Sequence, residues 1–190
     1  MNWSEKLFLQ INEQIGEREW FDKMMMFCAH NLLFVLVFIA FLWATTVLSE
    51  SGVDQLKRFF KIILTAGAFS YLFSWAWALL IPKKRPSEKY PEIKQLLNPL
   101  STWKTFPSDH TIAAFVVTLS VVLMGAPIWF GAFLTLLALL VGAGRVYVGV
   151  HYPKDILGGI LVACVFVLIS PWLLDNITQP VYKIFKQLFL

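Results

Sequence analysis

The sequence predicts an all-α membrane protein, a polytopic bundle of about five transmembrane helices with an interfacial helix at each end of the chain. Of its 190 residues, 58% are hydrophobic and only 15% are charged, and the mean hydropathy is +0.67. Two long stretches, 62–82 and 111–144, carry no charged residue. The chain has too few polar residues to cover so much apolar sequence in water. Its composition therefore excludes a soluble domain.

The predicted spans are 29–49, 60–81, 108–125, 127–146 and 156–174. Each is close to the roughly 20 residues that a helix needs to cross a bilayer. The 111–144 stretch is long enough for two spans, and Gly125 and Pro127 mark the turn between them. Since no internal repeat or low-complexity tract divides the chain, we expect 1–190 to form one membrane-embedded domain.

Both ends of the chain favour helices that lie in the membrane interface. Glu5 and Lys6 interrupt the first segment, which is therefore not typical of a cleaved signal peptide. Its apolar residues share one helical face and are Trp3, Leu7, Phe8, Ile11 and Ile15. Pro180 can begin the helix at the other end, where the apolar residues are Val181, Ile184, Phe185 and Leu188.

The net charge and the cysteines indicate which partners and cofactors the protein can have. The net charge of +4 and the pI near 9.1 suit anionic lipid headgroups. The basic residues do not cluster into a stripe, so we expect membrane lipids and no nucleic acid as partners, and the oligomeric state is left open. Cys28 and Cys164 have no metal or redox spacing and are expected to be buried space-fillers.

Five spans place the 82–107 loop and the 147–155 turn on one face of the membrane, because an even number of crossings separates them. Arg85 lies in this loop before Pro86, which restricts it to extended backbone. An ionisable group at this depth is a functional candidate, with snorkelling to the interface as the alternative. The other loop lysines are expected to be solvated near lipid phosphates, and they are Lys89, Lys94 and Lys104.

His110 begins a predicted span directly after Ser108 and Asp109. Either Ser108 or Asp109 could be an N-cap that satisfies backbone N–H groups. The start of a helix also carries partial positive charge and free donors, and it can hold phosphate oxygens. The N-cap interpretation leaves the histidine without a role, so both interpretations remain open.

The segment "GRVYVGVHYPKD" places Arg145 six positions before His151 and Asp155 four positions after it. A carboxylate on one imidazole nitrogen fixes the tautomer and leaves the other nitrogen free to attack. The structural alternative is that Asp155 only caps the next helix and His151 packs beside Tyr147. Together the two histidines, the two arginines and Ser108 suggest phosphoryl transfer with guanidinium groups holding the phosphate oxygens.

Three segments carry a family resemblance over roughly 60–160. Arg85-Pro86, then the run 107–110 (Pro-Ser-Asp-His), then Arg145 with His151 and Asp155 at the stated spacing resemble the three-part signature of the type 2 phosphatidic acid phosphatase superfamily. This resemblance implies a metal-independent lipid phosphatase without a cofactor. It implies that His151 attacks phosphorus and becomes phosphorylated, that Asp155 orients it and that His110 protonates the leaving oxygen. It also implies that the phosphoryl oxygens are held by Arg85, Arg145 and Ser108.

Three positions depart from the family pattern. Ala78 stands where the usual lysine of the first part falls, so that contact is absent or is supplied by Lys83 or Lys84, with Lys84 as the candidate phosphate ligand. Asp109 replaces a frequent glycine, and its carboxylate should point away from the bound anion. Gly144 replaces the serine often found before the arginine of the third part and removes one hydroxyl donor.

The small size and the Pro-Ser-Asp-His form resemble bacterial undecaprenyl diphosphate phosphatases, which release the lipid monophosphate used in cell wall biogenesis. Phosphatidylglycerol phosphate, phosphatidic acid and lipid A 1-phosphate are chemically admissible substrates. Two alternatives of other classes are a non-catalytic lipid transporter or scramblase and a metal site. The metal ligands would be His110, His151, Asp109 and Asp155.

The resemblance implies a bacterial inner (plasma) membrane protein whose active site is extracytoplasmic. The positive-inside rule points the other way, because eleven of the sixteen Lys and Arg residues fall on the predicted active face and five on the other.

Overall fold

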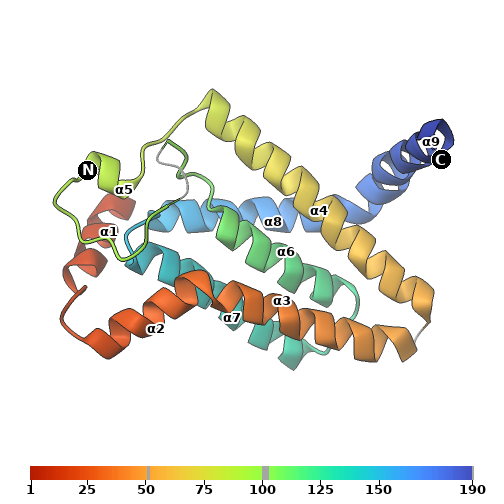
Figure 1. Cartoon of the computed structure of the whole chain (residues 1–190), viewed down its shortest axis with the longest axis horizontal. Helices are drawn as coiled ribbons and strands as arrows, with labels where there is room; N and C mark the ends of the chain where they lie inside the picture. Colours follow the sequence, from red (N-terminus) through yellow and green to blue (C-terminus); the bar gives the residue numbers. More distant parts are fainter. Residues whose placement is uncertain (51, 100–102, 190) are drawn as a thin grey trace.

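The computed structural model describes residues 1–50, 52–99 and 103–189, and these form helices joined by turns and loops (Figure 1). Each of the five predicted spans is helical. The elements in chain order are α1 (Trp3–Glu13), α2 (Glu19–His30), α3 (Leu32–Trp43), the π-helix η1 (Ala44–Leu48), α4 (Val53–Leu80), α5 (Pro86–Lys89), α6 (Asp109–Leu123), α7 (Ile128–Tyr147), α8 (Pro153–Leu173), the π-helix η2 (Leu174–Thr178) and α9 (Gln179–Phe189).

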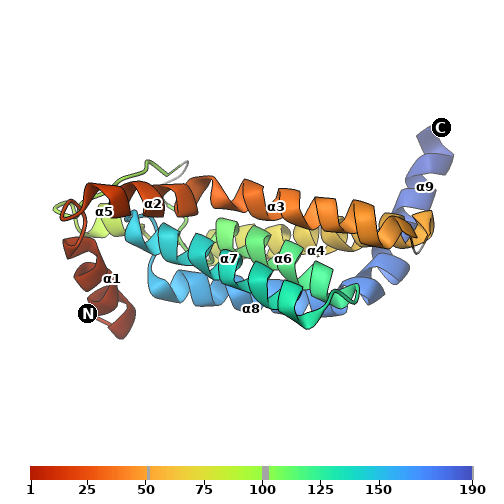
Figure 2. The same cartoon turned by 90° about the horizontal axis from the view of Figure 1, so that it is seen from below.

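The helices α3, α4, α7 and α8 surround the central helix α6 (Figures 1 and 2). α6 contacts all four of these neighbours. Its side chains Ile112 and Val121 are fully buried, and they join one apolar cluster with Leu36, Leu134 and Val167 from the surrounding helices. The core of the protein therefore lies around α6, which carries Asp109 and His110 at its first turn.

Among the described residues, three helical segments are long and apolar enough to cross a membrane, namely Val53–Leu80, Ile128–Tyr147 and Pro153–Leu188. The pair Glu19–His30 and Leu32–Leu48, bent by 52°, passes the same test as one span. α6 has 15 residues, which rise only about 22 Å at 1.5 Å per residue. The five predicted segments thus include one short helix, α6, that the other helices enclose.

Two helix boundaries differ from the prediction for the same reason. α4 begins at Val53 rather than near residue 60, and α2 forms a separate helix before the predicted span at 29–49. Charged residues occupy both extensions, including Lys57 and Arg58 in α4. Hydropathy marks only the apolar part of a helix, so it does not find a polar turn that continues the same helix beyond the membrane.

α1 docks on α7 and α8 at the end of the bundle where α8 begins (Figure 1). Phe8 is fully buried and its ring packs edge-on against Tyr152, with the centroids 5.3 Å apart. The Asn12 side chain donates to Lys94 O at 2.6 Å and accepts from Lys94 N at 3.0 Å. Trp3 and Leu7 remain exposed, so the predicted apolar face is shared between the bundle and the surroundings, and α1 also holds the 82–107 loop.

α9 leaves the opposite end of the bundle at an angle to α8 (Figures 1 and 2). It begins at Gln179, one residue before the predicted Pro180. The predicted apolar residues Val181, Ile184, Phe185 and Leu188 are all more than half exposed, and this pattern is typical of a helix that lies in a membrane interface.

Candidate active site

The three sequence motifs meet at one end of the bundle, as the even number of crossings predicted. Arg85 Nη1 donates a hydrogen bond of 2.8 Å to Val150 O, which joins the 82–107 loop to the α7–α8 turn. The backbone N–H of Ser108 donates to Asp155 O at 3.1 Å, which joins the start of α6 to the start of α8. A Cβ on Gly158 would lie 2.3 Å from the Phe106 ring, so glycine permits this close approach of α8 to the loop before α6.

The two ring nitrogens of the buried His151 face different partners. Nδ1 lies 3.4 Å from Thr105 Oγ1 and 3.7 Å from Asp155 Oδ2. Nε2 lies 3.5 Å from Arg85 Nη1. Because the Thr105 hydroxyl donates to Asp155 Oδ2 at 2.6 Å, its oxygen can accept a hydrogen bond from a protonated Nδ1. This tautomer leaves the lone pair on Nε2.

Asp155 is fully buried and has two tasks. Its Oδ2 atom accepts from Tyr152 N at 2.8 Å, so it caps α8 as the structural alternative predicted. The same oxygen accepts from Thr105 and faces the His151 ring beyond normal hydrogen-bond distance. Thr105 is therefore the residue that connects the carboxylate to the imidazole, and no motif or spacing in the sequence predicted its role.

Burial lowers the pKa of His151 to about 4. The charges of Arg85 and Arg145 lower it as well, and these effects exceed the opposite effects of Asp155. Burial also lowers the pKa of the Arg85 guanidinium, while Asp109 and Asp155 raise it. At pH 7 the imidazole of His151 is therefore neutral.

Ser108 occupies the N-cap position of α6, but its side chain makes no cap hydrogen bond. Its Oγ atom instead accepts from Thr111 Oγ1 at 3.1 Å. The side-chain N-cap interpretation is therefore wrong for Ser108. Because the hydroxyl accepts from Thr111, its own proton is available for another acceptor.

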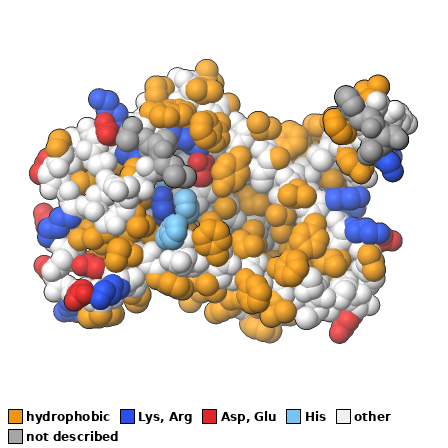
Figure 3. All heavy atoms as spheres, in the orientation of Figure 1, with side chains coloured by type: hydrophobic (Ala, Val, Ile, Leu, Met, Phe, Trp, Pro, Cys, Tyr) orange, Lys and Arg blue, Asp and Glu red, His pale blue; other side chains and the backbone are white. Residues whose placement is uncertain are grey.

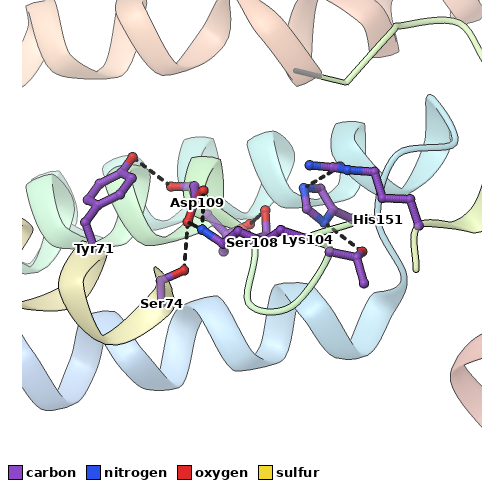
Figure 4. A network of polar contacts seen from close by, with 9 residues as sticks. Tyr71, Ser74, Lys104, Ser108, Asp109 and His151 are labelled. Atoms are coloured by element: carbon purple, nitrogen blue, oxygen red, sulfur yellow. Dashed lines mark hydrogen bonds and ion pairs between the residues drawn. The ribbon is translucent and has the colours of Figure 1, made fainter. Parts of the chain in front are cut away.

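Asp109 is held from α4 and from the preceding loop (Figure 4). Lys104 Nζ lies 2.6 Å from each carboxylate oxygen, and Ser74 Oγ donates to Oδ1 at 2.8 Å. Tyr71 OH donates to Asp109 O at 3.3 Å. The carboxylate thus turns toward α4 and away from His151, in line with the expectation that it avoids a bound anion.

Of the three loop lysines that the sequence predicted to be solvated, Lys104 is buried, whereas Lys89 and Lys94 are exposed. Lys104 is only 4% exposed, and its ammonium lies 4.9 Å from the centre of the Trp75 ring. Lys89 pairs with Glu5 at 2.7 Å, and Lys94 Nζ donates to Ile15 O at 2.5 Å. The expectation of a solvated side chain is wrong for Lys104, because Asp109 in the first turn of α6 and the Trp75 ring enclose its ammonium. Lys89 and Lys94 remain exposed, although α1 supplies a hydrogen-bond partner to Lys89 and the segment just after α1 supplies one to Lys94.

Arg145 and Gly144 lie where α7 packs against the end of α2. Arg145 is buried, and its Nη1 atom donates to Ala29 O at 3.3 Å. A Cβ on Gly144 would lie 2.6 Å from Ala29 N and 2.9 Å from the carbonyl carbon of Cys28. The departure from serine therefore has a steric cause, since the backbone of α2 occupies the space of a side chain.

The remaining predicted residues lie around this site. His110 is half-buried in the first turn of α6, within electrostatic reach of His151, Arg145 and His30. Lys84 is exposed beside Arg85, and its role as a phosphate ligand stays a prediction. Lys83 Nζ lies 4.6 Å from the centre of the Phe106 ring, and Ala78 is buried.

Within the described residues, no group of three or more His, Cys, Asp or Glu side chains is placed to hold a metal ion. The Asp109 carboxylate, one of the four ligands of the metal alternative, is already paired with Lys104. The polar groups of the site are thus two guanidinium groups, two imidazoles, the Asp155 carboxylate and the hydroxyls of Thr105 and Ser108.

A membrane-helix bundle with a neutral, buried histidine beside two arginines defines a class, the integral membrane enzymes that act on phosphate groups. Comparison with protein families identifies the superfamily to which the chain belongs. The family model of the PAP2 superfamily matches residues 55–179, and the chain belongs to this superfamily of membrane lipid phosphatases.

Two curated relatives are similar in sequence. The Escherichia coli (strain K12) protein YbjG, provisionally named an undecaprenyl-diphosphatase, is 32% identical over 163 residues, which cover 84% of this chain and 77% of that protein. The undecaprenyl-diphosphatase BcrC of Bacillus subtilis (strain 168) is 39% identical over 61 residues, which cover 32% of this chain and 31% of BcrC. The similarity to BcrC is thus limited to one segment.

Two crystal structures share the fold. LpxE of Aquifex aeolicus aligns with a TM-score of 0.65 and 24% identity, covering 87% of this chain and 92% of LpxE. A transmembrane PAP2-type phosphatidylglycerolphosphate phosphatase from Bacillus subtilis aligns with a TM-score of 0.60 and 19% identity, covering 92% of this chain and 85% of that protein. These similarities establish the bundle architecture.

Proposed function

We propose that the protein hydrolyses the terminal phosphate of undecaprenyl diphosphate through a phosphohistidine on His151. The observation that carries the proposal is that the two ring nitrogens of His151 have different partners. Nδ1 faces Thr105 and Asp155, and Nε2 faces Arg85. One nitrogen is held in place, and the other is directed toward a guanidinium that can bind phosphate oxygens.

The reaction has two steps. The Nε2 lone pair forms a bond to the terminal phosphorus while the bond from phosphorus to the bridging oxygen breaks, and His110 donates a proton to that oxygen as undecaprenyl phosphate leaves. Water then attacks the phosphohistidine, His110 accepts a proton from the water, and the N–P bond breaks to release inorganic phosphate. Three groups stabilise the charge on the phosphoryl oxygens, namely Arg85, Arg145 and the Ser108 hydroxyl.

No metal takes part in the proposed reaction, because fixed guanidinium groups supply the positive charge. Lys104 and Ser74 support this scheme indirectly. They bind the Asp109 carboxylate, which would otherwise repel the substrate from a position next to His110.

Two observations favour a polyprenyl diphosphate as substrate. The relatives YbjG and BcrC carry the name undecaprenyl-diphosphatase. An apolar hollow of about 350 Å³ lies on α4 and is lined by Ala68, Tyr71, Leu72 and Trp75. The Tyr71 hydroxyl donates a hydrogen bond to Asp109 O, so the hollow lies next to the start of α6. An apolar chain could lie in this hollow while the diphosphate reaches the arginines.

The test is phosphate release by the purified full-length protein on a panel of lipids. Undecaprenyl diphosphate is expected to be hydrolysed faster than phosphatidylglycerol phosphate, phosphatidic acid or lipid A 1-phosphate, in excess EDTA and with inhibition by vanadate. An alkaline quench with substrate labelled on its terminal phosphate should trap label on the wild type and none on the His151→Ala variant. Lipid binding without phosphate release would instead favour a transporter or scramblase, and loss of activity in EDTA would favour a metal.

We also propose that the protein lies in the bacterial inner membrane with this site on the extracytoplasmic face. The excess of cations there has structural explanations, since Lys89 and Lys104 pair with acids and Lys94 bonds a backbone carbonyl. In a variant without Cys28 and Cys164, Lys84→Cys is expected to react with a membrane-impermeant maleimide in intact cells, and Asp54→Cys is not. The reverse labelling pattern would contradict this orientation.

A further inference from the structure

A polar cavity lies at the end of the bundle away from His151. It has a volume of about 340 Å³ and lies between the first turns of α4 and the junction of η2 with α9. Figure 3 shows Lys and Arg side chains at this end of the molecule, near the helix that leaves the bundle. The lining residues are Asp54, Gln55, Lys57, Arg58, Lys61, Leu174 and Gln179.

The cavity has an excess of positive charge, with three cations and one carboxylate in its lining. Lys57 Nζ pairs with Asp54 Oδ1 at 3.3 Å, but both side chains are largely exposed and such a pair stabilises little. Lys57 and Lys61 are four residues apart on one face of α4, and like charges at this spacing destabilise a helix. An anion in the cavity would remove this repulsion.

The position of the cavity relative to the bilayer indicates which anion can reach it. The uncharged stretch 62–82 begins directly after Lys61, and the 28 residues of α4 extend about 42 Å, beyond the roughly 30 Å hydrocarbon core. The first turns of α4 therefore lie at the level of the lipid phosphates. α9 begins at the cavity with Gln179. It exposes Val181, Ile184 and Leu188 and has the pattern of an interfacial helix.

We propose that this cavity binds the phosphate of an anionic phospholipid headgroup. Arg58 and Lys61 bind the phosphate oxygens, with Lys57 adding charge and the Gln55 amide adding a hydrogen-bond donor. The bound lipid connects the start of α4 to η2 and α9, two segments far apart in the sequence. The proposal concerns the membrane face opposite the active site and does not depend on the phosphatase reaction.

The test is native mass spectrometry of the full-length protein in detergent with an equimolar mixture of phosphatidylglycerol and phosphatidylethanolamine. The wild type is expected to retain one phosphatidylglycerol, and Arg58→Gln/Lys61→Gln is expected to lower its affinity about 10-fold or more. Lys23→Gln, at the other end of the molecule, is the matched control and should bind like the wild type. The thermal unfolding midpoint of each variant checks that it is folded.

Three results would overturn the proposal. Equal retention of phosphatidylglycerol by the wild type and the double variant would show that the cavity is not the site. Equal retention of the two lipids by the wild type would show no preference for an anionic headgroup. Displacement of the lipid by low millimolar inorganic phosphate would identify the ligand as a free anion instead.

Discussion

Asp155 and Asp109 are both carboxylates in the first turn of a helix at the active site, yet the protein holds them in different ways. Asp155 is fully buried and bonds the backbone of Tyr152, three positions away in the sequence. Asp109 is 31% exposed and is held by Lys104 in the loop and by Ser74 on α4. Asp155 thus combines a local cap of α8 with the hydrogen bond from Thr105 in the loop before α6, whereas Asp109 depends on the nearby Lys104 and on the distant helix α4.

This difference matches the proposed roles of the two histidines. His151, on the α7–α8 turn, is buried and held from its Nδ1 side, as a nucleophile requires. His110, at the start of α6, is half-buried and so remains within reach of a leaving group and of water. The following predictions test whether the two parts of the site have these separate roles.

The largest expected effect is the loss of either histidine. His151→Ala should lower kcat about 10⁴-fold or more for every substrate, because no other nucleophile replaces it. His110→Ala should cost about 10²–10⁴-fold on a lipid monophosphate such as phosphatidic acid, whose alkoxide leaving group needs a proton, and much less on nitrophenyl phosphate, whose leaving group is weakly basic. Phosphate release on both substrates measures this, and an equal loss on both in His110→Ala would contradict its role as the acid.

Thr105→Val comes next. The valine keeps the shape but removes the hydroxyl that links Asp155 to His151, and a hydrogen bond to a charged group contributes about 1.5–3 kcal/mol. We expect kcat to fall about 10- to 100-fold with little change in KM, and Thr105→Ser to restore most of it. Wild-type kcat in the valine variant would show that Asp155 orients His151 without Thr105.

A smaller effect is expected for the ion pair at the start of α6. Lys104→Met should lower the free energy of unfolding by about 2 kcal/mol, below the 3–5 kcal/mol of a fully buried pair because Asp109 is partly exposed. Adding Asp109→Asn should recover part of this loss. Lys23→Met is the control, since its pair with Glu19 is exposed and should matter little. Strictly additive losses in denaturant unfolding would argue against coupling between Lys104 and Asp109.

The smallest effect at neutral pH concerns the titration of His151. Its folded-state pKa of about 4 lies below the usual 6.5, so the folded protein binds fewer protons than the unfolded chain between these values. The stabilising contribution of the neutral imidazole is complete above pH 6.5 and is lost as the pH falls toward 4. Nitrogen-15 NMR titration of histidine-labelled protein, assigned with His151→Gln, should show His151 neutral at pH 5.5, and a midpoint near 6.5 would contradict the burial effect.

The sequence by itself determined the helical membrane class and the meeting of the three motifs at one end of the bundle. Hydropathy depends only on local composition. An even number of membrane crossings between two loops places them on the same face, whatever the packing of the helices. The spacing of His151 and Asp155 likewise predicted a local contact, because four residues across a turn cannot separate far.

Only the tertiary structure decided which residues complete the site. Thr105 lies between Asp155 and His151, Lys104 neutralises Asp109, and the backbone of Ala29 occupies the space that a serine at position 144 would need. These contacts join residues that share no periodicity or motif, so they exist only after α6 has packed against α4 and α8 and α2 has packed against α7.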